Sequence, residues 1–299
     1  MSTYLELEIA SQPDCWRRAA TVARVSASLL PSRGERVAVI GCGTSWFMAM
    51  CYAALREAAR DGWTDAFSAS DLPRDRAYDR VVAITRSGTT TEILDALDEL
   101  RGRVPTVAIT GDTSTAIGSV ADELIALEYA DERSVVQTRF ATTSLALLRA
   151  SLGQDMEPVA ADADRAMGIA IEHLVRATQV SFLGSGWTTG LAYEAALKLR
   201  EAAQAWTEAY SAAEYRHGPV SIAEPGRATW MLGTPTPGLA DDIRATGADF
   251  VWHSGLDPMA ALVVAQRTAL GMAVVRGLDA DNPRALTRSV ILAPSRDAP

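Results

Sequence analysis

The two stretches that decide the fold are RVAVIGCGTS, residues 36–45, and QVSFLGSGWTTG, residues 179–190. Each stretch reads as an apolar strand, then a pair of glycines around one small residue, then hydroxyl residues at the start of a helix. The second stretch begins about half a chain length after the first, which is the pattern of an internal repeat. The sequence therefore predicts two similar α/β halves.

Within the first half, hydrophobic patterning predicts strands that alternate with helices. The predicted strands are 36–40, 64–68, 80–85, 105–110 and 123–128, and the predicted helices are 45–60, 90–102 and 138–152. The second half repeats this arrangement, with strands at 179–183, 228–232, 249–252 and 289–293 and helices at 187–205, 238–246 and 258–276. Such alternation is typical of a parallel sheet that is covered on both faces. The predicted fold class is therefore α/β, with two doubly wound, flavodoxin-like subdomains, each a parallel sheet flanked by helices.

The stretch SLGQDMEPVAADADR, near residues 150–165, is polar and interrupts this pattern. We expect the linker between the halves to lie there, so that the first subdomain spans residues 1–155 and the second spans residues 156–299. A chain of 299 residues is long enough for two such domains.

Composition excludes several classes of protein. The formal net charge of −9 argues against a nucleic-acid partner. No run approaches the length of a membrane span, and the start, MSTYLELEIASQPD, lacks the pattern of a signal peptide. The three cysteines show neither metal spacing nor a disulfide framework. We expect a cytoplasmic protein with no metal, no cofactor and no membrane partner.

The turn GCGTS could bind an anion. A strand that ends in glycines at the start of a helix points backbone N–H groups at one spot, where the helix is partly positive, and the hydroxyls of Thr44 and Ser45 could add donors. The dinucleotide fingerprint fails, because Trp46 stands where its third glycine is needed. The structural alternative is a tight turn with a Ser or Thr cap.

A second turn of this kind is TRSGTTTE, residues 85–92, which follows a predicted strand and precedes a predicted helix. The carboxyl ends of parallel strands are where ligands bind, so two hydroxyl-rich turns there could close on one phosphate. The alternative is a helix cap by Ser87 or Thr89 with Glu92 as its capping-box partner. A cap needs one hydroxyl, and this turn has several, so the sequence favours phosphate binding.

The stretch EAALKLREAAQAWTEAYSAAEYRHGPVSI, residues 194–222, combines charged and apolar positions. Glu194, Lys198 and Glu201 share one helical face, which is most often a salt-bridged face in solvent. The positions between them are mostly small or apolar, so we expect a largely buried helix. His217 lies at a Gly-Pro break, where loops often carry function.

These motifs together resemble a known family. GCGTS, SGTT, EAALKLREAAQAWTEAYSAAEYRHGP and DADNPRALTRSV (279–290) are similar to the isomerase portion of glucosamine-6-phosphate synthase, and more broadly to the two-domain sugar isomerase (SIS) family. The resemblance runs from EIASQP (8–13) almost to the end of the chain.

The resemblance implies roles for individual residues and a C-terminal tail that lies over the active site. Residues that would hold the sugar phosphate are Ser45, Thr85, Ser87 and Thr90, with Arg86 between them. Glu201 would move a proton between carbons 1 and 2, Lys198 would orient Glu201 or a substrate hydroxyl, and Val135 would line the sugar site. His217 would assist ring opening from the partner subunit of a homodimer.

The departures from the family pattern bear on the chemistry. The synthase has an amidotransferase domain that this sequence lacks, so we expect no ammonia supply from glutamine. Thr287-Arg288 stands where the synthase has an alanine-lysine pair whose lysine forms an imine. Arginine is a poor imine former, so Arg288 could instead bind a hydroxyl or a carboxylate. Arg86 and Thr89 stand where the family often has glutamine and glutamate.

The resemblance and its departures lead to three hypotheses. The first is an enzyme that abstracts the proton at carbon 2 of a hexosamine 6-phosphate and acts as an isomerase and deaminase, releasing ammonia and a ketose phosphate. The second is a lyase that dehydrates an N-acetylhexosamine 6-phosphate. The third is a sugar-phosphate sensor without catalysis.

Overall fold

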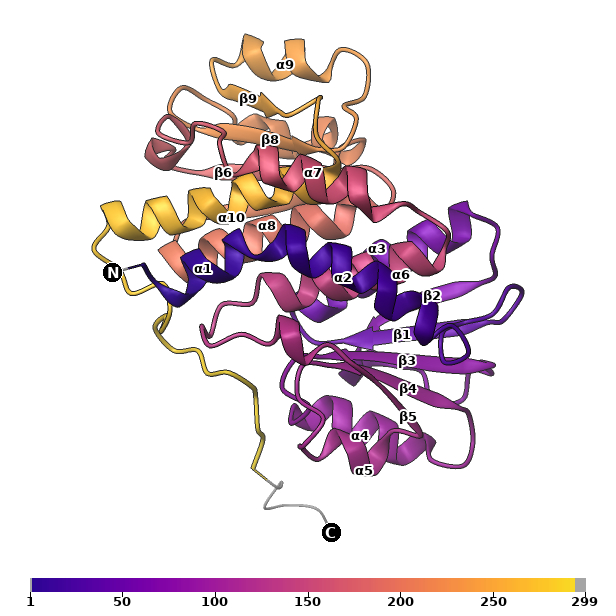
Figure 1. Ribbon diagram of the computed structural model, residues 1–299. Helices are drawn as coiled ribbons and strands as arrows, with labels where there is room; N and C mark the ends of the chain where they lie inside the picture. Colours follow the sequence, from indigo (N-terminus) through magenta and orange to yellow (C-terminus); the bar gives the residue numbers. More distant parts are fainter. Residues whose placement is uncertain (1, 294–299) are drawn as a thin grey trace.

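The computed structural model describes residues 2–293 and contains two parallel sheets, with a layer of helices between them (Figure 1). The first sheet has the order β2-β1-β3-β4-β5, with bounds Val37–Gly41 (β1), Thr64–Ser68 (β2), Arg80–Thr85 (β3), Thr106–Thr110 (β4) and Glu123–Ala126 (β5). The second sheet has the order β7-β6-β8-β9, with bounds Val180–Gly184 (β6), Thr207–Ser211 (β7), Ala228–Leu232 (β8) and Asp249–Trp252 (β9). The predicted α/β class with two similar parallel sheets is confirmed.

Both sheets follow the flavodoxin-like order, in which the chain changes direction across the sheet after its second strand. As a result β1 pairs with β3, and β6 pairs with β8, although neither pair is consecutive in the chain. Ligands of such sheets bind outside the carboxyl ends of the two central strands. This topology places the turns GCGTS and TRSGTTTE side by side.

Ten helices are found among residues 2–293. Their bounds are Tyr4–Ala10 (α1), Gln12–Val25 (α2), Thr44–Ala58 (α3), Thr91–Leu100 (α4), Ile117–Val120 (α5), Arg139–Ser151 (α6), Met156–Ala166 (α7), Thr188–Ala203 (α8), Leu239–Ala245 (α9) and Pro258–Val275 (α10). In Figure 1, α4 and α5 cover the outer face of the first sheet and α9 covers the outer face of the second.

The main hydrophobic core lies between the sheets, where α3 packs directly on α8 and α2 packs on α6 and α7. Gly190 of α8 permits the close approach of α3, since a Cβ at this position would lie 2.4 Å from the Phe47 carbonyl oxygen. The two sheets are therefore joined by shared helical packing.

The stretch in which we expect the linker forms α7, where Val159, Ala160 and Ala163 share a face that is buried in the core, and the boundary between the halves stays a prediction. Two expectations about strands are wrong. The strand predicted at 289–293 does not form: these residues belong to the C-terminal tail, residues 279–293, and Ile291 is 72% exposed. The strand β7 was missed, because TEAYS mixes polar and apolar residues immediately after a helix.

Helix α10 is the one helix within residues 2–293 that is long and apolar enough to cross a membrane, with a mean hydropathy of 1.5 over 18 residues. The sequence analysis did not anticipate it. In the structure 67% of this window is buried, and the helix packs against α8 and α7. It has the setting of a core helix.

Candidate functional site

A cavity of about 190 Å³ lies at the carboxyl ends of β1 and β3. Segments from both halves of the chain and from the C-terminal tail form its wall. The lining residues are Cys42, Gly43, Thr44, Arg86, Thr90, Glu92, Val135, Gln137, Glu201, Leu286, Thr287, Arg288, Ser289 and Val290.

The structure brings most of the predicted site residues to this cavity. Those that line it are Thr44, Arg86, Thr90, Val135, Glu201 and Arg288. Ser45, Thr85 and Ser87 are buried in the two turns beside it. Lys198 lies behind the wall and reaches it through bonds to Thr44 and Glu201.

The turn after β1 is built for close backbone packing. A Cβ on Gly41 would lie 2.4 Å from the backbone carbonyl carbon of Ser45, so only glycine allows α3 to start so near the strand. Gly43, with φ of 53°, is the N-cap of α3, and no side chain caps this helix. The alternative that Thr44 or Ser45 serves as a cap is therefore wrong.

The turn after β3 also has no side-chain cap. Thr90 is the N-cap of α4, and its side chain makes no capping hydrogen bond. Glu92 is the second residue of the helix, so the capping-box alternative is wrong as well. Ser87 Oγ accepts from the Thr89 N–H at 3.3 Å, and Thr85 Oγ1 accepts from the Gly88 N–H at 3.3 Å. These two hydroxyls shape the turn, and Thr90, which makes no capping bond, is among the residues that line the cavity.

The charged face of α8 is buried, as predicted, and forms what we call the α8 acid–base cluster: Glu194, Lys198 and Glu201. Lys198 Nζ donates to Glu201 Oε2 and to Thr44 Oγ1, the latter at 3.0 Å, and lies 3.6 Å from Glu194 Oε1. The Glu201 side chain is 18% exposed and is the member of the cluster that lines the cavity. One ammonium thus joins the carboxylate of α8 to the anion-binding turn of α3.

Burial determines the charge states of this cluster. It raises the pKa of Glu194, which is fully buried, to about 8, and the nearby Lys198 ammonium only partly offsets this. Burial lowers the pKa of Lys198, but the Glu194 and Glu201 carboxylates outweigh burial and raise it above its usual value. Lys198 therefore stays charged beside Glu201, and Glu194 is the carboxyl that takes up a proton as the pH falls below about 8.

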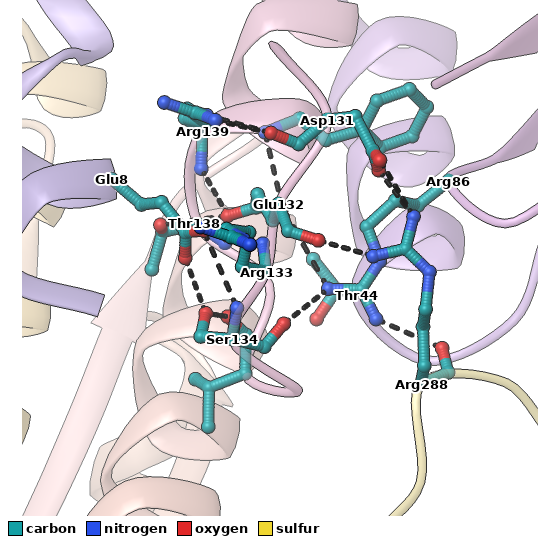
Figure 2. A network of polar contacts seen from close by, with 12 residues as sticks. Glu8, Thr44, Arg86, Asp131, Glu132, Arg133, Ser134, Thr138, Arg139 and Arg288 are labelled. Carbon is teal, nitrogen blue, oxygen red and sulfur yellow. Dashed lines mark hydrogen bonds and ion pairs between the residues drawn. The ribbon is translucent and has the colours of Figure 1, made fainter. Parts of the chain in front are cut away.

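Two buried carboxylates hold loop 131–138 in place: Glu8 of α1 and Glu132 of the loop itself (Figure 2). Glu132 accepts from the backbone N–H groups of Thr138 and Arg139 at 2.6 and 2.9 Å, which satisfies the free donors at the start of α6. Glu8 accepts from the backbone N–H and the hydroxyl of Ser134. These contacts fix the loop that carries Val135 to the cavity.

Sequence reasoning missed several lining residues, among them Cys42, Glu92 and Gln137. Glu92 Oε2 and Gln137 Oε1 are buried without a hydrogen-bond partner, as is Arg86 Nε. Unpartnered buried polar atoms are rare, and here they line one cavity, which is typical of a site that binds a polar ligand. Gln137 lies two residues after Val135, in a loop that gave no periodic signal of its own.

His217 lies apart from the cavity of its own chain. It ends a short 3-10 turn, Glu214–His217, in the second subdomain, its side chain is exposed, and it is absent from the residues that line the cavity. A role in catalysis would require it to act on the site of another subunit.

A larger groove of about 610 Å³ lies elsewhere, along α10 and the end of α7. Its walls are mainly apolar, with Met167, Ile171 and Leu270 among them, and it contains no hydroxyl residue. The smaller cavity is the better candidate, because it combines a glycine- and hydroxyl-containing turn at a helix start with Glu201 of the charged cluster, and the larger groove has neither. Residues 2–293 contain no group of three or more His, Cys, Asp or Glu side chains placed to hold a metal ion.

The fold is an α/β arrangement of two parallel sheets like that of the sugar isomerase (SIS) proteins, with a polar cavity at the switch point of the first sheet. Comparison with known proteins agrees. The structure matches a glucosamine-6-phosphate deaminase from Thermotoga maritima with a TM-score of 0.82 at 23% identity, covering 97% of this chain and 100% of that one. It matches the C-terminal domain of glucosamine-fructose-6-phosphate aminotransferase from Francisella tularensis with a TM-score of 0.81 at 19% identity, covering 95% and 99% of the two chains.

Sequence comparison leads to the same group of proteins. The chain is 27% identical over 293 residues to the glutamine–fructose-6-phosphate aminotransferase (isomerizing) of Sulfurisphaera tokodaii, an alignment that covers 86% of this chain and 50% of that protein. The chain spans about half the length of the curated relatives it matches. No protein-family model matches it. The resemblance to the isomerase portion of this aminotransferase, which is also called glucosamine-6-phosphate synthase, is confirmed.

Proposed function

We propose that the protein is a sugar-phosphate isomerase that acts on a hexosamine 6-phosphate and releases ammonia. One observation carries this proposal: Lys198 Nζ bonds both Thr44, in the anion-binding turn, and Glu201, a carboxylate that lines the same cavity. A pure binding site for a sugar phosphate needs no buried acid–base cluster. The matched deaminase and aminotransferase domain support the assignment of substrate class.

In this proposal the phosphate lies at the starts of α3 and α4. Backbone N–H groups and the positive ends of both helices attract the dianion, and the hydroxyl of Thr90 donates to it. The protein as a whole is acidic, so the local donors, rather than the net charge, provide this attraction. The sugar chain then extends from the phosphate toward Glu201 and Val135.

Glu201 is the base that abstracts the proton from carbon 2 of the open-chain sugar. The electron pair of the C2–H bond forms an enolamine, and return of the proton to carbon 1 gives a 2-imine. Water adds to the imine, and ammonia leaves to give the ketose phosphate. Lys198 holds the Glu201 carboxylate in position and stabilises negative charge that develops on the substrate oxygen.

We further propose that the active form is a homodimer in which His217 of one subunit assists ring opening in the other. The exposure of His217 and its absence from the lining of the cavity in its own chain support this arrangement. A His217→Ala variant should be inactive alone and should regain part of its activity when it is mixed with a Glu201→Gln variant, since mixed dimers would contain one intact site.

The substrate is tested by incubating the protein with glucosamine 6-phosphate and, separately, with its N-acetyl form, and following both by NMR. The proposal predicts fructose 6-phosphate and ammonium from the first compound. A vinylic proton from the second compound alone would assign a dehydratase instead. Tight binding of either compound without any product would assign a sensor.

A further inference from the structure

The two arginines at which this chain departs from the family pattern, Arg86 and Arg288, touch one another. Arg86 Nη2 donates to the backbone carbonyl of Arg288 at 2.8 Å. Arg86 follows β3, and Arg288 lies in the C-terminal tail, so two segments about 200 residues apart meet at the cavity.

Both arginines also bind the same loop (Figure 2). Arg288 Nη2 donates to the Asp131 carboxylate at 2.6 and 2.8 Å, and Arg288 Nη1 donates to the Glu132 carbonyl. Arg86 Nη1 donates to the Ser134 carbonyl at 3.0 Å. The Arg86 side chain is 1% exposed, whereas those of Arg288 and Asp131 are 39% and 33% exposed. Arg86 is therefore the buried anchor, and Arg288 with Asp131 is the part that solvent can reach.

The tail that Arg288 holds is bonded to the phosphate turn itself. Thr89 Oγ1 donates to Ser289 Oγ at 2.9 Å, and the Thr91 N–H donates to the Val290 carbonyl at 3.2 Å. The Leu292 N–H donates to Thr91 Oγ1 at 2.9 Å. Residues 286–290 of the tail form one wall of the cavity, so its size and access depend on where the tail lies.

We propose that Arg86, Asp131 and Arg288 form a latch that fixes the tail as a wall of the cavity, and that Asp131 and Arg288 are positioning residues. Arginine suits this task, because a planar guanidinium donates in fixed directions to a carboxylate and a carbonyl at once, whereas a lysine ammonium is a point charge. Arg288 thus fixes where the tail lies. In this proposal the contacts of the latch break when a ligand enters or leaves the cavity. This inference rests on the proposed function only in taking the cavity as the sugar-phosphate site.

The test compares hydrogen exchange of tail peptides covering residues 286–293 in wild type, Asp131→Asn, Arg288→Met and the double variant. The matched control is Asp98→Asn, which removes a carboxylate from an exposed pair with Arg101 on the outer helix α4. We expect tail exchange about two- to fivefold faster in Asp131→Asn than in wild type, the range for a partly exposed pair. The control should match wild type. The double variant should resemble Arg288→Met, since that change already removes the ion pair with Asp131 together with the bond to the Glu132 carbonyl.

The same variants are then tested for the dissociation rate of fructose 6-phosphate, measured by stopped-flow displacement. An opened latch should release the ligand faster in Asp131→Asn and should leave the melting temperature unchanged. Tail exchange equal to that of wild type in Asp131→Asn, or additive effects in the double variant, would overturn the latch. Neither readout needs turnover. If the variants differ from wild type as expected but wild type converts no hexosamine 6-phosphate, the latch is supported and the proposed function is refuted.

Discussion

The turn after β1 in the first sheet and the turn after β6 in the second sheet have the same backbone geometry. A Cβ on Gly41 would lie 2.4 Å from backbone atoms of the following helix, and a Cβ on Gly184 would lie 2.2 Å from them. The second glycine of each turn has a similar φ, 53° at Gly43 and 56° at Gly186. The backbone of the repeat therefore predicts two equivalent sites, but only one of them carries the site described above.

The difference lies in the next turn of each sheet. After β3 and Arg86 the chain reads SGTT. Each of these four residues has a backbone N–H, and all but the glycine have a hydroxyl. After β8 it reads GTPTPG, and Pro235 and Pro237 have no N–H to offer. Gly233 packs so near α8 that a Cβ would lie 2.8 Å from Thr188 Oγ1, and this hydroxyl already bonds Ser185. The fold is shared, but the capacity to hold an anion depends on these turn residues.

The helices that follow the two glycine turns also differ, and here the second half of the chain has the polar residues. Counted from the paired glycines, the three charged positions of the α8 acid–base cluster correspond in α3 to Cys51, Leu55 and Ala58. The first half thus supplies the hydroxyl-rich turns and an apolar helix, and the second half supplies the charged cluster. Under the proposed function, phosphate binding and proton transfer would therefore come from different copies of the repeat.

The largest effect is expected from Lys198→Met. This change leaves the Glu201 carboxylate, whose side chain is 18% exposed, without its buried cation, and loss of one partner of a buried ion pair costs up to about 3–5 kcal/mol. Leu55→Met at the corresponding position of α3 should cost less than about 1.5 kcal/mol, as volume-conserving core changes do. Urea unfolding of the two variants measures both values. Equal costs would show that the charged cluster is not coupled as the structure indicates.

A smaller effect is expected from Thr90→Val in the phosphate turn. Hydrogen bonds to charged groups contribute about 1.5–3 kcal/mol, so the Kd for fructose 6-phosphate should rise about tenfold or more. Thr234→Val in the turn after β8 is the matched control, since Thr234 is exposed and lies outside the cavity. Calorimetry checks both. A Kd that changes equally in the two variants would remove the distinction between the turns.

The pH dependence of stability provides a third comparison. Burial raises the pKa of Glu194 to about 8 from an ordinary value of 4.5, so the folded state binds the additional proton between these values. The free energy of unfolding should therefore fall as the pH rises from about 5 to 8, by at most about 1.4 kcal/mol per pH unit from this group. Glu194→Gln should flatten this slope, whereas Glu157→Gln, at an exposed site on α7, should leave it unchanged. A wild-type stability that does not decrease across this range would contradict the assignment.

Hydrophobic patterning predicted all the strands of the first sheet and three of the four strands of the second, because buried parallel strands such as β3 and β8 are mainly apolar runs. Hydrophobic patterning failed where contacts between distant segments determine the conformation. Val290 and Ile291 read as a strand but lie exposed in the tail, and no local signal shows that Asp131 would hold Arg288. Gln137 lines the cavity in a loop that Glu8, from the distant helix α1, and Glu132, within the loop, hold in place.

The central claim is that Glu201 moves the carbon-2 proton of a sugar phosphate held by the first half of the chain. The most direct test is NMR of glucosamine 6-phosphate in heavy water with wild type and with Glu201→Gln. With wild type we predict that deuterium enters the product during the transfer of the carbon-2 proton. With the variant we predict a turnover rate at least about 10²-fold lower, the scale of general base catalysis. Turnover by Glu201→Gln at the wild-type rate would contradict the account.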